Sequence, residues 1–298
     1  MKNSELITIG IPVYNEGEFL ACTLESCVGQ AKKVVIFDNA STDSTEDICR
    51  EYAERYNNIE YIRNETNQGQ VASFWGVQNR AETPYFSWMG AHDAIPEGYV
   101  DTALALLRNS DAVAIHSPIQ YVDKKTREEL FLIKHTDVEK LSSANAWERV
   151  LSLICYLRNT MVYGIFKIDV LRNAWIEGRY LGTDHVYMCK VAAEGKILYT
   201  TDTYRILAED PQESKEGSLK RWRTSLSEDG KSLIALEHET MIQGQLKVLK
   251  RTLPPGDGKK LLDKAESILR YRFEEKTLFR RVKLSLKKRF VFKTKNLF

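Results

Sequence analysis

The chain has 298 residues, of which 43% are hydrophobic, and its 43 Lys and Arg residues outnumber its 41 Asp and Glu residues by two. This length can bury a sizeable core in one large domain or in one domain with an appendage, and the near balance of charge excludes a protein that binds polyanions through net charge alone. Five cysteines without a CxxC pair, no signal-peptide pattern and no apolar run of about 18 residues argue against a disulfide framework, a zinc knuckle, secretion and a membrane span, and favour a reducing cytosol.

The first half of the chain alternates short β-rich apolar runs with segments of helical length. The runs lie at residues 6–12, 34–38, 59–62, 85–89 and 112–117. Strands separated in this way predict right-handed βαβ units and a mostly parallel central sheet flanked by helices. Ser41 and Thr42, followed by the acid-rich run 43–56, predict the beginning of one of these helices. The expected fold class is α/β.

Polar sequences follow three of these strands. They are PVYNEGE after the first strand, DNASTD at the end of the second and GAHD after the fourth. Open α/β sheets bind ligands beyond the carboxyl ends of their strands, so we expect the functional site there. No GxGxxG and no GxxxxGK[ST] follows any strand, which argues against a dinucleotide-binding oxidoreductase and a P-loop NTPase.

The second half of the chain has a different character. From about residue 140 the pattern becomes helical and aromatic, with a second β-like stretch at 196–207. The polar, proline-containing segment 209–218 predicts a surface loop at the end of the main domain. We therefore predict one domain over residues 1–210 and a helical C-terminal extension over 211–298 that is interrupted by PPGDG at 254–258.

The motif PVYNE and the following IFDNASTDSTEDI together resemble the opening of the family 2 glycosyltransferases, which have the GT-A fold. The resemblance implies transfer of a sugar from a nucleotide diphosphate. It also implies that Pro12, Tyr14 and Glu16 line the nucleotide pocket and that Asp38 accepts a hydrogen bond from the base. An ionised carboxylate suits that role because it only accepts hydrogen bonds, and a uracil-like edge offers an N–H group.

The segment NQGQVASFWG resembles the N-x-G element with which the family opens a helix, and Asn67 and Gly69 stand at its fixed positions. The resemblance implies that both residues lie at the nucleotide-sugar. Glycine permits close approach of the backbone to a ligand, and a helix N-terminus favours anions. A plain helix start with Asn67 as its cap explains the same residues.

The segment WMGAHDAIPEGYV stands where the family has its metal-binding Asp-x-Asp, and it departs from that pattern. Gly90 occupies the first acidic position, His92 the penultimate one, and only Asp93 is retained. The implied Mn²⁺ or Mg²⁺ needs few protein ligands because the diphosphate supplies others, so Asp93 can suffice. His92 as a second ligand beside the donor would favour Mn²⁺, and a structural hydrogen-bonding role for His92 stays equally open.

The segment GRYLGTDHVYMCKVAAEGKILYT resembles the family's catalytic segment, in which an acid opens a helix that leads to Gly-Lys and a strand. Asp184 matches the acid. In an inverting enzyme, Asp184 would remove the acceptor's hydroxyl proton as that oxygen attacks the anomeric carbon from the side opposite the diphosphate. The alternative role for Asp184 is a helix cap after Thr183. His185 is a weaker candidate for the base, because neighbouring helical residues face different directions.

The segment SLKRW partly resembles the Q-x-x-R-W motif of the processive branch, with Ser218 in place of Gln. The resemblance implies that Arg221 grips the diphosphate and that Trp222 stacks on an acceptor sugar. A surface helix that holds both residues without a function is the alternative. The absence of membrane spans argues against a processive polymer synthase.

The C-terminal tail, residues 276–298, carries nine basic residues and no acid. Apolar residues recur every four positions from Leu278 to Phe290, which predicts an apolar stripe beside a cationic face. Such a helix either lies on an anionic membrane surface or docks on its own core with a solvated basic face. No nucleic-acid-binding module accompanies the charge, so we expect no nucleic-acid partner.

The resemblance extends over about residues 5–205. It predicts a metal-dependent, inverting glycosyltransferase of the hexosyltransferase type that takes a UDP-sugar and acts on a glycan or lipid-linked hydroxyl in cell-envelope polysaccharide synthesis. We expect a cytoplasmic protein that the tail brings to the inner face of the plasma membrane.

A non-catalytic sugar-nucleotide or glycan-binding module stays open as an alternative function, because the first acid of the metal motif is missing. A nucleotidyltransferase shares the α/β architecture, but no Gly-rich basic loop such as GxGxR lies near the N-terminus.

Overall fold

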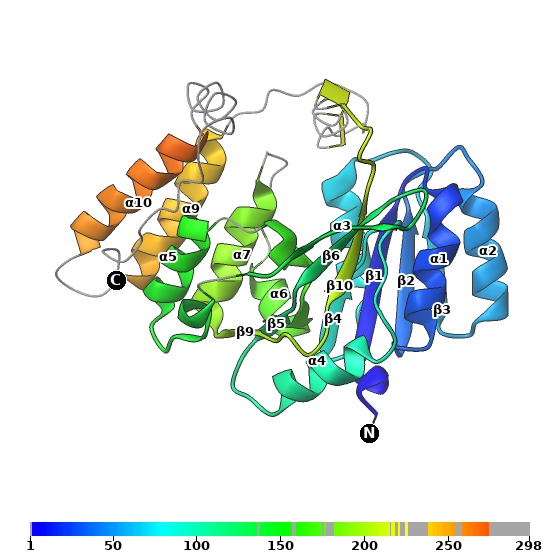
Figure 1. Cartoon of the computed structure of the whole chain (residues 1–298), viewed down its shortest axis with the longest axis horizontal. Coiled ribbons are helices and arrows are strands. Elements are labelled where there is room, and N and C mark those ends of the chain that lie inside the picture. Colours follow the sequence, from blue (N-terminus) through cyan, green and yellow to red (C-terminus); the bar gives the residue numbers. More distant parts are fainter. Residues whose placement is uncertain are drawn as a thin grey trace.

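The computed structural model describes residues 2–135, 138–156, 159–174, 176, 182–214, 216–217, 220, 224–225, 238–253 and 258–273. Within them, a seven-stranded sheet lies between two layers of helices, and a three-stranded sheet lies beside it (Figure 1). In spatial order the large sheet comprises β3 (Ile59–Arg63), β2 (Lys33–Asp38), β1 (Ile7–Val13), β4 (Tyr85–Trp88), β8 (Ile165–Lys167), β5 (Ala114–His116) and β9 (Ile197–Tyr199). The small sheet comprises β10 (Arg205–Glu209), β6 (Ile119–Asp123) and β7 (Glu129–Ile133).

The helices follow the strands as the sequence pattern predicts. The α-helices are α1 (Gly17–Val28), α2 (Thr45–Arg55), α3 (Gln70–Asn79), α4 (Tyr99–Arg108), α5 (Ala146–Tyr156), α6 (Ile168–Ala174), α7 (Thr183–Glu194), α9 (Glu239–Thr252) and α10 (Gly258–Phe273). Among the described residues, the short 3₁₀ helices are η1 (Asn3–Leu6), η2 (Glu139–Ser142) and η3 (Asn159–Tyr163). Within the residues that the structure describes, no helix has both the length and the apolarity that a membrane crossing requires.

The large sheet is mostly parallel, which confirms the predicted α/β class. Pairs β1–β2, β2–β3, β1–β4 and β5–β9 run parallel, whereas β8 runs antiparallel between β4 and β5. All five predicted strands form, with ends that differ by a few residues. The single β-like stretch predicted over 196–207 is wrong as one unit, since it divides into β9 in the large sheet and β10 in the small one. A strand of three residues, such as β8 or β9, is too short for the alternation of apolar and polar residues to be recognised in the sequence.

The two faces of the sheet bury separate hydrophobic clusters. Alternate residues of β1, beginning with Ile7 and Ile9, pack on the face that α1, α2 and α4 cover. On the opposite face Gly10 of β1 lies against α3 and β4, where a Cβ atom would be 2.6 Å from the Phe86 ring and 2.8 Å from Val77. Glycine at this position therefore sets the close approach of α3 to the strand that leads into the PVYNE loop.

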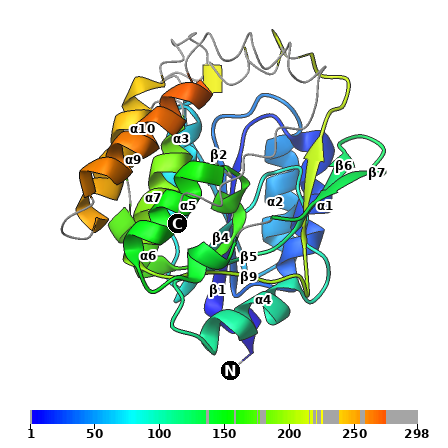
Figure 2. The ribbon, with the colours of Figure 1, turned by 60° about the vertical axis from the view of Figure 1, so that its left-hand side comes forward.

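Helix α9 packs against α5 and α7, and α10 packs against α9 and α5 (Figure 2). Buried residues Met241 and Leu249 of α9 and Leu269 of α10 belong to the same cluster as Trp88 of β4. The described part of the C-terminal region is thus helical, as predicted, and shares the core of the sheet. The domain division at residue 210 stays a prediction, and the tail at 276–298 lies outside the described residues.

One helix begins later than the sequence suggests. The predicted start at Ser41 and Thr42 is early, because α2 begins at Thr45 with Ser44 as its N-cap residue. The backbone N–H of Ser41 instead donates to Oδ1 of Asp38 at 2.9 Å, which keeps this stretch in the loop. The side chain of Asp43 accepts the Thr45 N–H at 3.0 Å, so an acid still stabilises the first turn.

Candidate active site

The three predicted polar motifs meet at one edge of the sheet. PVYNE ends β1, DNASTD ends β2 and GAHD follows β4, and these strands are neighbours in the order β2-β1-β4. The register pairs Val13 with Asp38 and Gly10 with Trp88, so the three carboxyl ends lie side by side. This is the edge at which open α/β sheets bind ligands.

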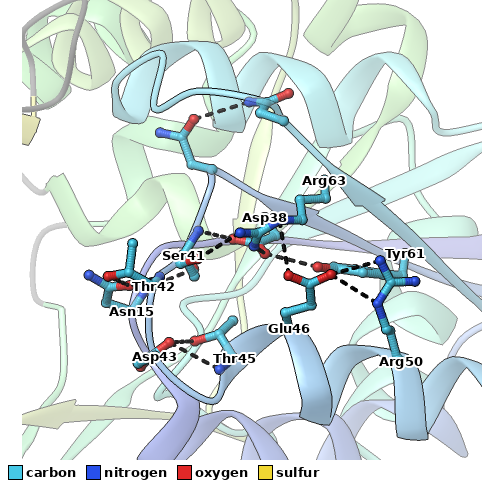
Figure 3. A network of polar contacts seen from close by, with 12 residues as sticks. Asn15, Asp38, Ser41, Thr42, Asp43, Thr45, Glu46, Arg50, Tyr61 and Arg63 are labelled. Carbon is cyan, nitrogen blue, oxygen red and sulfur yellow. Dashed lines mark hydrogen bonds and ion pairs between the residues drawn. The ribbon is translucent and has the colours of Figure 1, made fainter.

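Asp38 is the centre of a polar network at the end of β2 (Figure 3). Its side chain is 0% exposed; Oδ1 accepts the Ser41 N–H, and Oδ2 accepts the Tyr61 hydroxyl at 2.9 Å and pairs with the guanidinium of Arg63. Arg63 also donates to the Ser41 carbonyl at 2.7 Å and lies 3.2 Å from Oε2 of Glu46. Burial and the bond to Asp38 raise the pKa of Tyr61. Both Asp38 oxygens are engaged within the protein, so its hydrogen bond to a nucleobase stays a prediction.

The loops after β1 and β2 are joined by backbone-to-side-chain hydrogen bonds (Figure 3). Asn15, in the left-handed region at φ 54°, accepts the Thr42 N–H at 2.8 Å and donates its own N–H to Ser41 Oγ at 2.9 Å. Asp43 Oδ2 accepts the Gly17 N–H at 3.0 Å. Partial burial raises the pKa of Asp43, but the bonds from Thr45 and Gly17 outweigh it, and the net pKa is lowered. These hydrogen bonds join the end of β1, which carries Pro12 and Tyr14, to the loop after β2.

Pro12 and Tyr14 differ in exposure. Pro12 is half-buried in β1 opposite Phe37 of β2, whereas Tyr14 is 38% exposed beyond the end of β1. An exposed aromatic ring at a ligand-binding edge is available to a flat ligand such as a nucleobase. Contact of either residue with a nucleotide stays a prediction.

Asn67 and Gly69 belong to a second hydrogen-bonded loop. Oδ1 of Asn67 accepts the Gly69 N–H at 2.9 Å and Nδ2 of Asn39 at 2.7 Å. Asn39 was not singled out in the sequence, and its Oδ1 accepts the Gln68 N–H at 2.9 Å. The N-cap residue of α3 is Gly69, at φ 81°, so Asn67 shapes the turn before the helix and does not cap it. The predicted donor contacts of Asn67 and Gly69 remain predictions.

The carboxylate of Asp93 explains the glycine at the first acidic position of the metal motif. Asp93 is 4% exposed, and its Oδ1 accepts the Ala208 N–H of β10 at 3.0 Å. A Cβ atom at Gly90 would lie 2.3 Å from Oδ2 of Asp93, so that carboxylate occupies the space of a side chain at position 90. Thr23 of α1 donates to the Asp93 carbonyl at 2.7 Å and fixes the backbone. The position of the Asp93 carboxylate therefore leaves no room for an acidic side chain at position 90.

His92 lies between two carboxylates. Its Nδ1 is 3.1 Å from Oε1 of Glu16, and its Nε2 is 3.9 Å from Oδ1 of Asp93. Oε2 of Glu16 is in turn 2.8 Å from Nζ of Lys124. Burial raises the pKa of Glu16, but His92 and Lys124 outweigh it, so the net pKa is lowered. Lys124 lies in the turn between β6 and β7, far away in the sequence, and no motif could have indicated it.

Among the described residues, the side chains that could bind a metal are few. In the described ranges, no three His, Cys, Asp or Glu side chains gather as a metal-binding group. His92 and Asp93 nevertheless offer an imidazole nitrogen and a carboxylate 3.9 Å apart. That donor set fits Mn²⁺ or Mg²⁺ when a diphosphate supplies the remaining ligands.

Asp184 lies in the first turn of α7 and is half-buried. The N-cap residue is Gly182, at φ 76°, without a side-chain cap, so the alternative of Asp184 as a helix cap is not what the structure contains. The ring centroid of the adjacent His185 lies 6.3 Å from that of Phe273 in α10, and its weaker candidacy as base stays a prediction. The role of Asp184 as base stays a prediction.

Tyr163 is a half-buried residue of η3 whose pKa is raised. Burial of the hydroxyl raises this pKa most, and the negative charges of Asp93 and Asp184 raise it further. Sequence inspection did not identify Tyr163, which lies in an aromatic segment without a distinctive pattern.

Arg205 is a further residue that the sequence analysis missed. It is buried at the start of β10, donates to Ser87 Oγ at 2.8 Å and to the Trp88 carbonyl at 2.9 Å, and also bonds the Tyr163 carbonyl. It thereby holds the end of β4 that leads into GAHD. An arginine inside an apolar strand pattern is the signal that could have indicated it.

Two predicted residues cannot be placed. Arg221 and Trp222, with the rest of their SLKRW motif except Lys220, lie outside the described residues. Their contacts with the diphosphate and the acceptor stay predictions.

Known proteins resemble the chain over much of its length. The minor teichoic acid biosynthesis protein GgaB of Bacillus subtilis (strain 168) is 25% identical over 198 residues, which make up 63% of this chain and 20% of GgaB. The chain spans a third or less of the curated relatives that it matches first.

Solved structures share the fold. TarS of S. aureus in complex with UDP-GlcNAc has a TM-score of 0.65 at 16% identity, covering 97% of this chain and 77% of that one. The mannosyltransferase PcManGT from Pyrobaculum calidifontis, in complex with GDP-Man and Mn²⁺, has a TM-score of 0.58 at 15% identity, covering 94% of this chain and 74% of that one. These likenesses confirm the predicted GT-A fold. The family described as "Glycosyl transferase family 2" matches residues 8–164, more than half of the sequence, and the chain belongs to that family.

Proposed function

We propose that this chain is an inverting, metal-dependent glycosyltransferase that moves a sugar from a UDP-sugar to a hydroxyl of a glycan or lipid-linked acceptor. The observation that carries the proposal is that PVYNE, DNASTD and GAHD meet at the neighbouring carboxyl ends of β1, β2 and β4 in a chain of the family 2 glycosyltransferases. An inverting transferase needs a donor site and, on the opposite side of the anomeric carbon, a base, for which Asp184 in the first turn of α7 is the candidate.

The donor would bind at the carboxyl ends of β1, β2 and β4. Tyr14 would cover the base, and the hydrogen-bonded loops around Asp38 and Asn67 would present an ordered surface to the nucleotide, which reduces the entropy lost on binding. The N-terminus of α3 at Gly69 would favour the diphosphate. A divalent cation held by Asp93 and His92 would neutralise charge on the diphosphate as it leaves.

The acceptor hydroxyl would lose its proton to Asp184. Asp184 is half-buried in the first turn of α7, so its carboxylate is partly accessible to an acceptor hydroxyl.

The relatives support the substrate classes without deciding them for this chain. TarS was solved with UDP-GlcNAc, PcManGT with GDP-Man and Mn²⁺, and GgaB is described as a teichoic acid biosynthesis protein. We therefore propose cell-envelope polysaccharide synthesis as the process. We also propose that the basic tail at 276–298 brings the protein to the inner face of the plasma membrane.

The test is release of nucleoside diphosphate from a panel of nucleotide-sugars, with glycan and lipid-linked acceptors, in Mn²⁺, Mg²⁺ or EDTA. Wild type is expected to release UDP from one donor with a metal and not in EDTA. Both Asp93→Ala and Asp184→Asn are expected to abolish most of that release. Release that is equal in EDTA would overturn metal dependence, and full activity of Asp184→Asn would overturn its role as base.

A non-catalytic nucleotide-sugar-binding module is the second candidate. The observation in its favour is Gly90 at the first acidic position, together with the lack of a three-residue metal group among the residues described. It predicts that calorimetry detects donor binding while no acceptor in the panel produces release.

A further inference from the structure

His92 is held through its two ring nitrogens in different ways. Nδ1 lies 3.1 Å from Oε1 of Glu16, whereas Nε2 lies 3.9 Å from Oδ1 of Asp93. A neutral imidazole donates a hydrogen bond from one nitrogen and accepts at the other. The angle at this contact does not meet hydrogen-bond geometry, but the negative charge of Glu16 beside Nδ1 favours the ring hydrogen on that nitrogen and leaves the Nε2 lone pair on the side of Asp93.

Glu16 is itself fixed by a cation from a distant segment. Nζ of Lys124 lies 2.8 Å from Oε2 and 3.1 Å from Oε1 of Glu16, and it stands over the Phe19 ring at 4.4 Å. The side chain of Lys124 is only 21% exposed. The Lys124 contact therefore holds the Glu16 carboxylate in place beside the His92 ring.

The turn between β6 and β7, which carries Lys124, also contacts the backbone of the metal motif. Arg127, in the left-handed region at φ 63°, donates from Nη1 to the His92 carbonyl at 2.9 Å. The Lys124 N–H donates to the Glu209 carbonyl of β10 at 2.8 Å, which anchors the turn to the small sheet. The β6–β7 turn thus contacts both the carboxylate partner and the backbone of one histidine.

We propose that Glu16 and Lys124 are positioning residues that hold His92 in the tautomer whose Nε2, together with Asp93, ligates the divalent cation. Proteins commonly fix metal-binding histidines through a carboxylate at the second nitrogen, and loss of such a partner typically weakens metal affinity about 10- to 100-fold. The inference rests on the proposed metal-dependent function. It gives Glu16 a role toward the metal rather than toward the nucleotide.

The experiment measures Mn²⁺ binding to the full chain in the presence of UDP, by electron paramagnetic resonance. Pulsed spectra of bound Mn²⁺ detect a coordinated imidazole nitrogen directly. Wild type is expected to show that nitrogen signal, and His92→Gln is expected to lose it. Glu16→Ala and Lys124→Met are expected to weaken Mn²⁺ affinity about 10- to 100-fold and to reduce the nitrogen signal.

Two further variants separate positioning from simple loss of charge or fold. Lys124→Arg keeps a cation that can reach Glu16 and is expected to retain most of the affinity and the signal. Lys125→Met removes the same charge from the neighbouring, exposed position and is expected to match wild type. Circular dichroism of each variant verifies that it is folded.

The outcomes distinguish the inference from the function on which it rests. Wild-type affinity and an unchanged nitrogen signal in Glu16→Ala and Lys124→Met would overturn the positioning role alone. A wild-type protein that binds UDP but no Mn²⁺ would overturn the metal-dependent function and the positioning role together. Mn²⁺ binding without a nitrogen signal in wild type would remove His92 from the ligand set and overturn the inference.

Discussion

The two sides of the candidate site are built in different ways. The donor side consists of loops whose polar side chains bond the backbones of neighbouring loops, as Asn15 does with Thr42 and Asn39 with Gln68. The side of the candidate base rests on packing, where Met241 of α9 lies against Gly182 at the start of α7. Short polar sequences can order adjacent loops, but the turn before α7 depends on a helix far along the chain.

The largest expected effect tests whether the two sides have separate functions. Asp184→Asn is expected to lower turnover about 10²- to 10⁴-fold, because a general base contributes that much, while UDP affinity stays near wild type. Turnover assays and calorimetry measure the two quantities. The neighbouring His185→Gln is the control and is expected to keep turnover within a few-fold of wild type, since His185 faces Phe273. Equal losses in both variants would point to damage to α7 rather than to a base.

The second-largest expected effect is on metal binding at the donor side. Gly90→Asp restores the first acid of the metal motif in sequence, yet its Cβ would lie 2.3 Å from Oδ2 of Asp93. We expect Mn²⁺ affinity in the presence of UDP to fall about 10- to 100-fold, because the displaced Asp93 loses its geometry. Gly29→Ala, whose Cβ meets nothing within 4 Å, is the control. Tighter Mn²⁺ binding by Gly90→Asp would show that position 90 is free to serve as a ligand.

The packing that holds α7 can be separated from backbone strain. Gly182→Ala places a Cβ 2.1 Å from Sδ of Met241 at a residue with φ 76°. The substitution therefore combines backbone strain with a steric clash, and both lower the free energy of unfolding. Gly98→Ala has a similar φ of 75° but meets nothing within 4 Å. We expect Gly98→Ala to cost about 1 kcal/mol of unfolding free energy and Gly182→Ala about 2–3 kcal/mol. Urea denaturation measures both, and equal losses would contradict a supporting role for Met241.

The smallest effect is the response of the donor-side loops to acid. The pKa of Asp43 in the folded protein is below its ordinary value of 3.8, so its bonds to Gly17 and Thr45 stabilise the fold fully above about pH 3.8. That contribution is lost as the pH falls through the lowered folded pKa. Asp43→Asn is therefore expected to be less stable than wild type at pH 6, with a difference that shrinks below pH 3.8. Denaturation at several pH values measures the difference, and a constant gap would exclude a role for the charge.

Local sequence determined the strands and the motif-bearing edge of this protein. Apolar runs bounded by polar turns define β1, β2 and β4, and parallel strands place their carboxyl ends together, so PVYNE, DNASTD and GAHD had to meet. The family and the GT-A fold follow from the order of these motifs, and both are confirmed. These features depend on residues close together in the chain and on general rules of sheet topology.

Only the tertiary structure decided which residues support the motifs. Lys124 reaches Glu16 because β6 and β7 form a hairpin beside β10, and Arg205 reaches the end of β4 because β10 lies apart from β9. Such contacts join segments about a hundred residues apart, and the local pattern of apolar and polar residues does not indicate them. Likewise, Gly90 departs from the family pattern, but only the position of Asp93 supplies the reason, since its carboxylate fills the space that a Cβ would take.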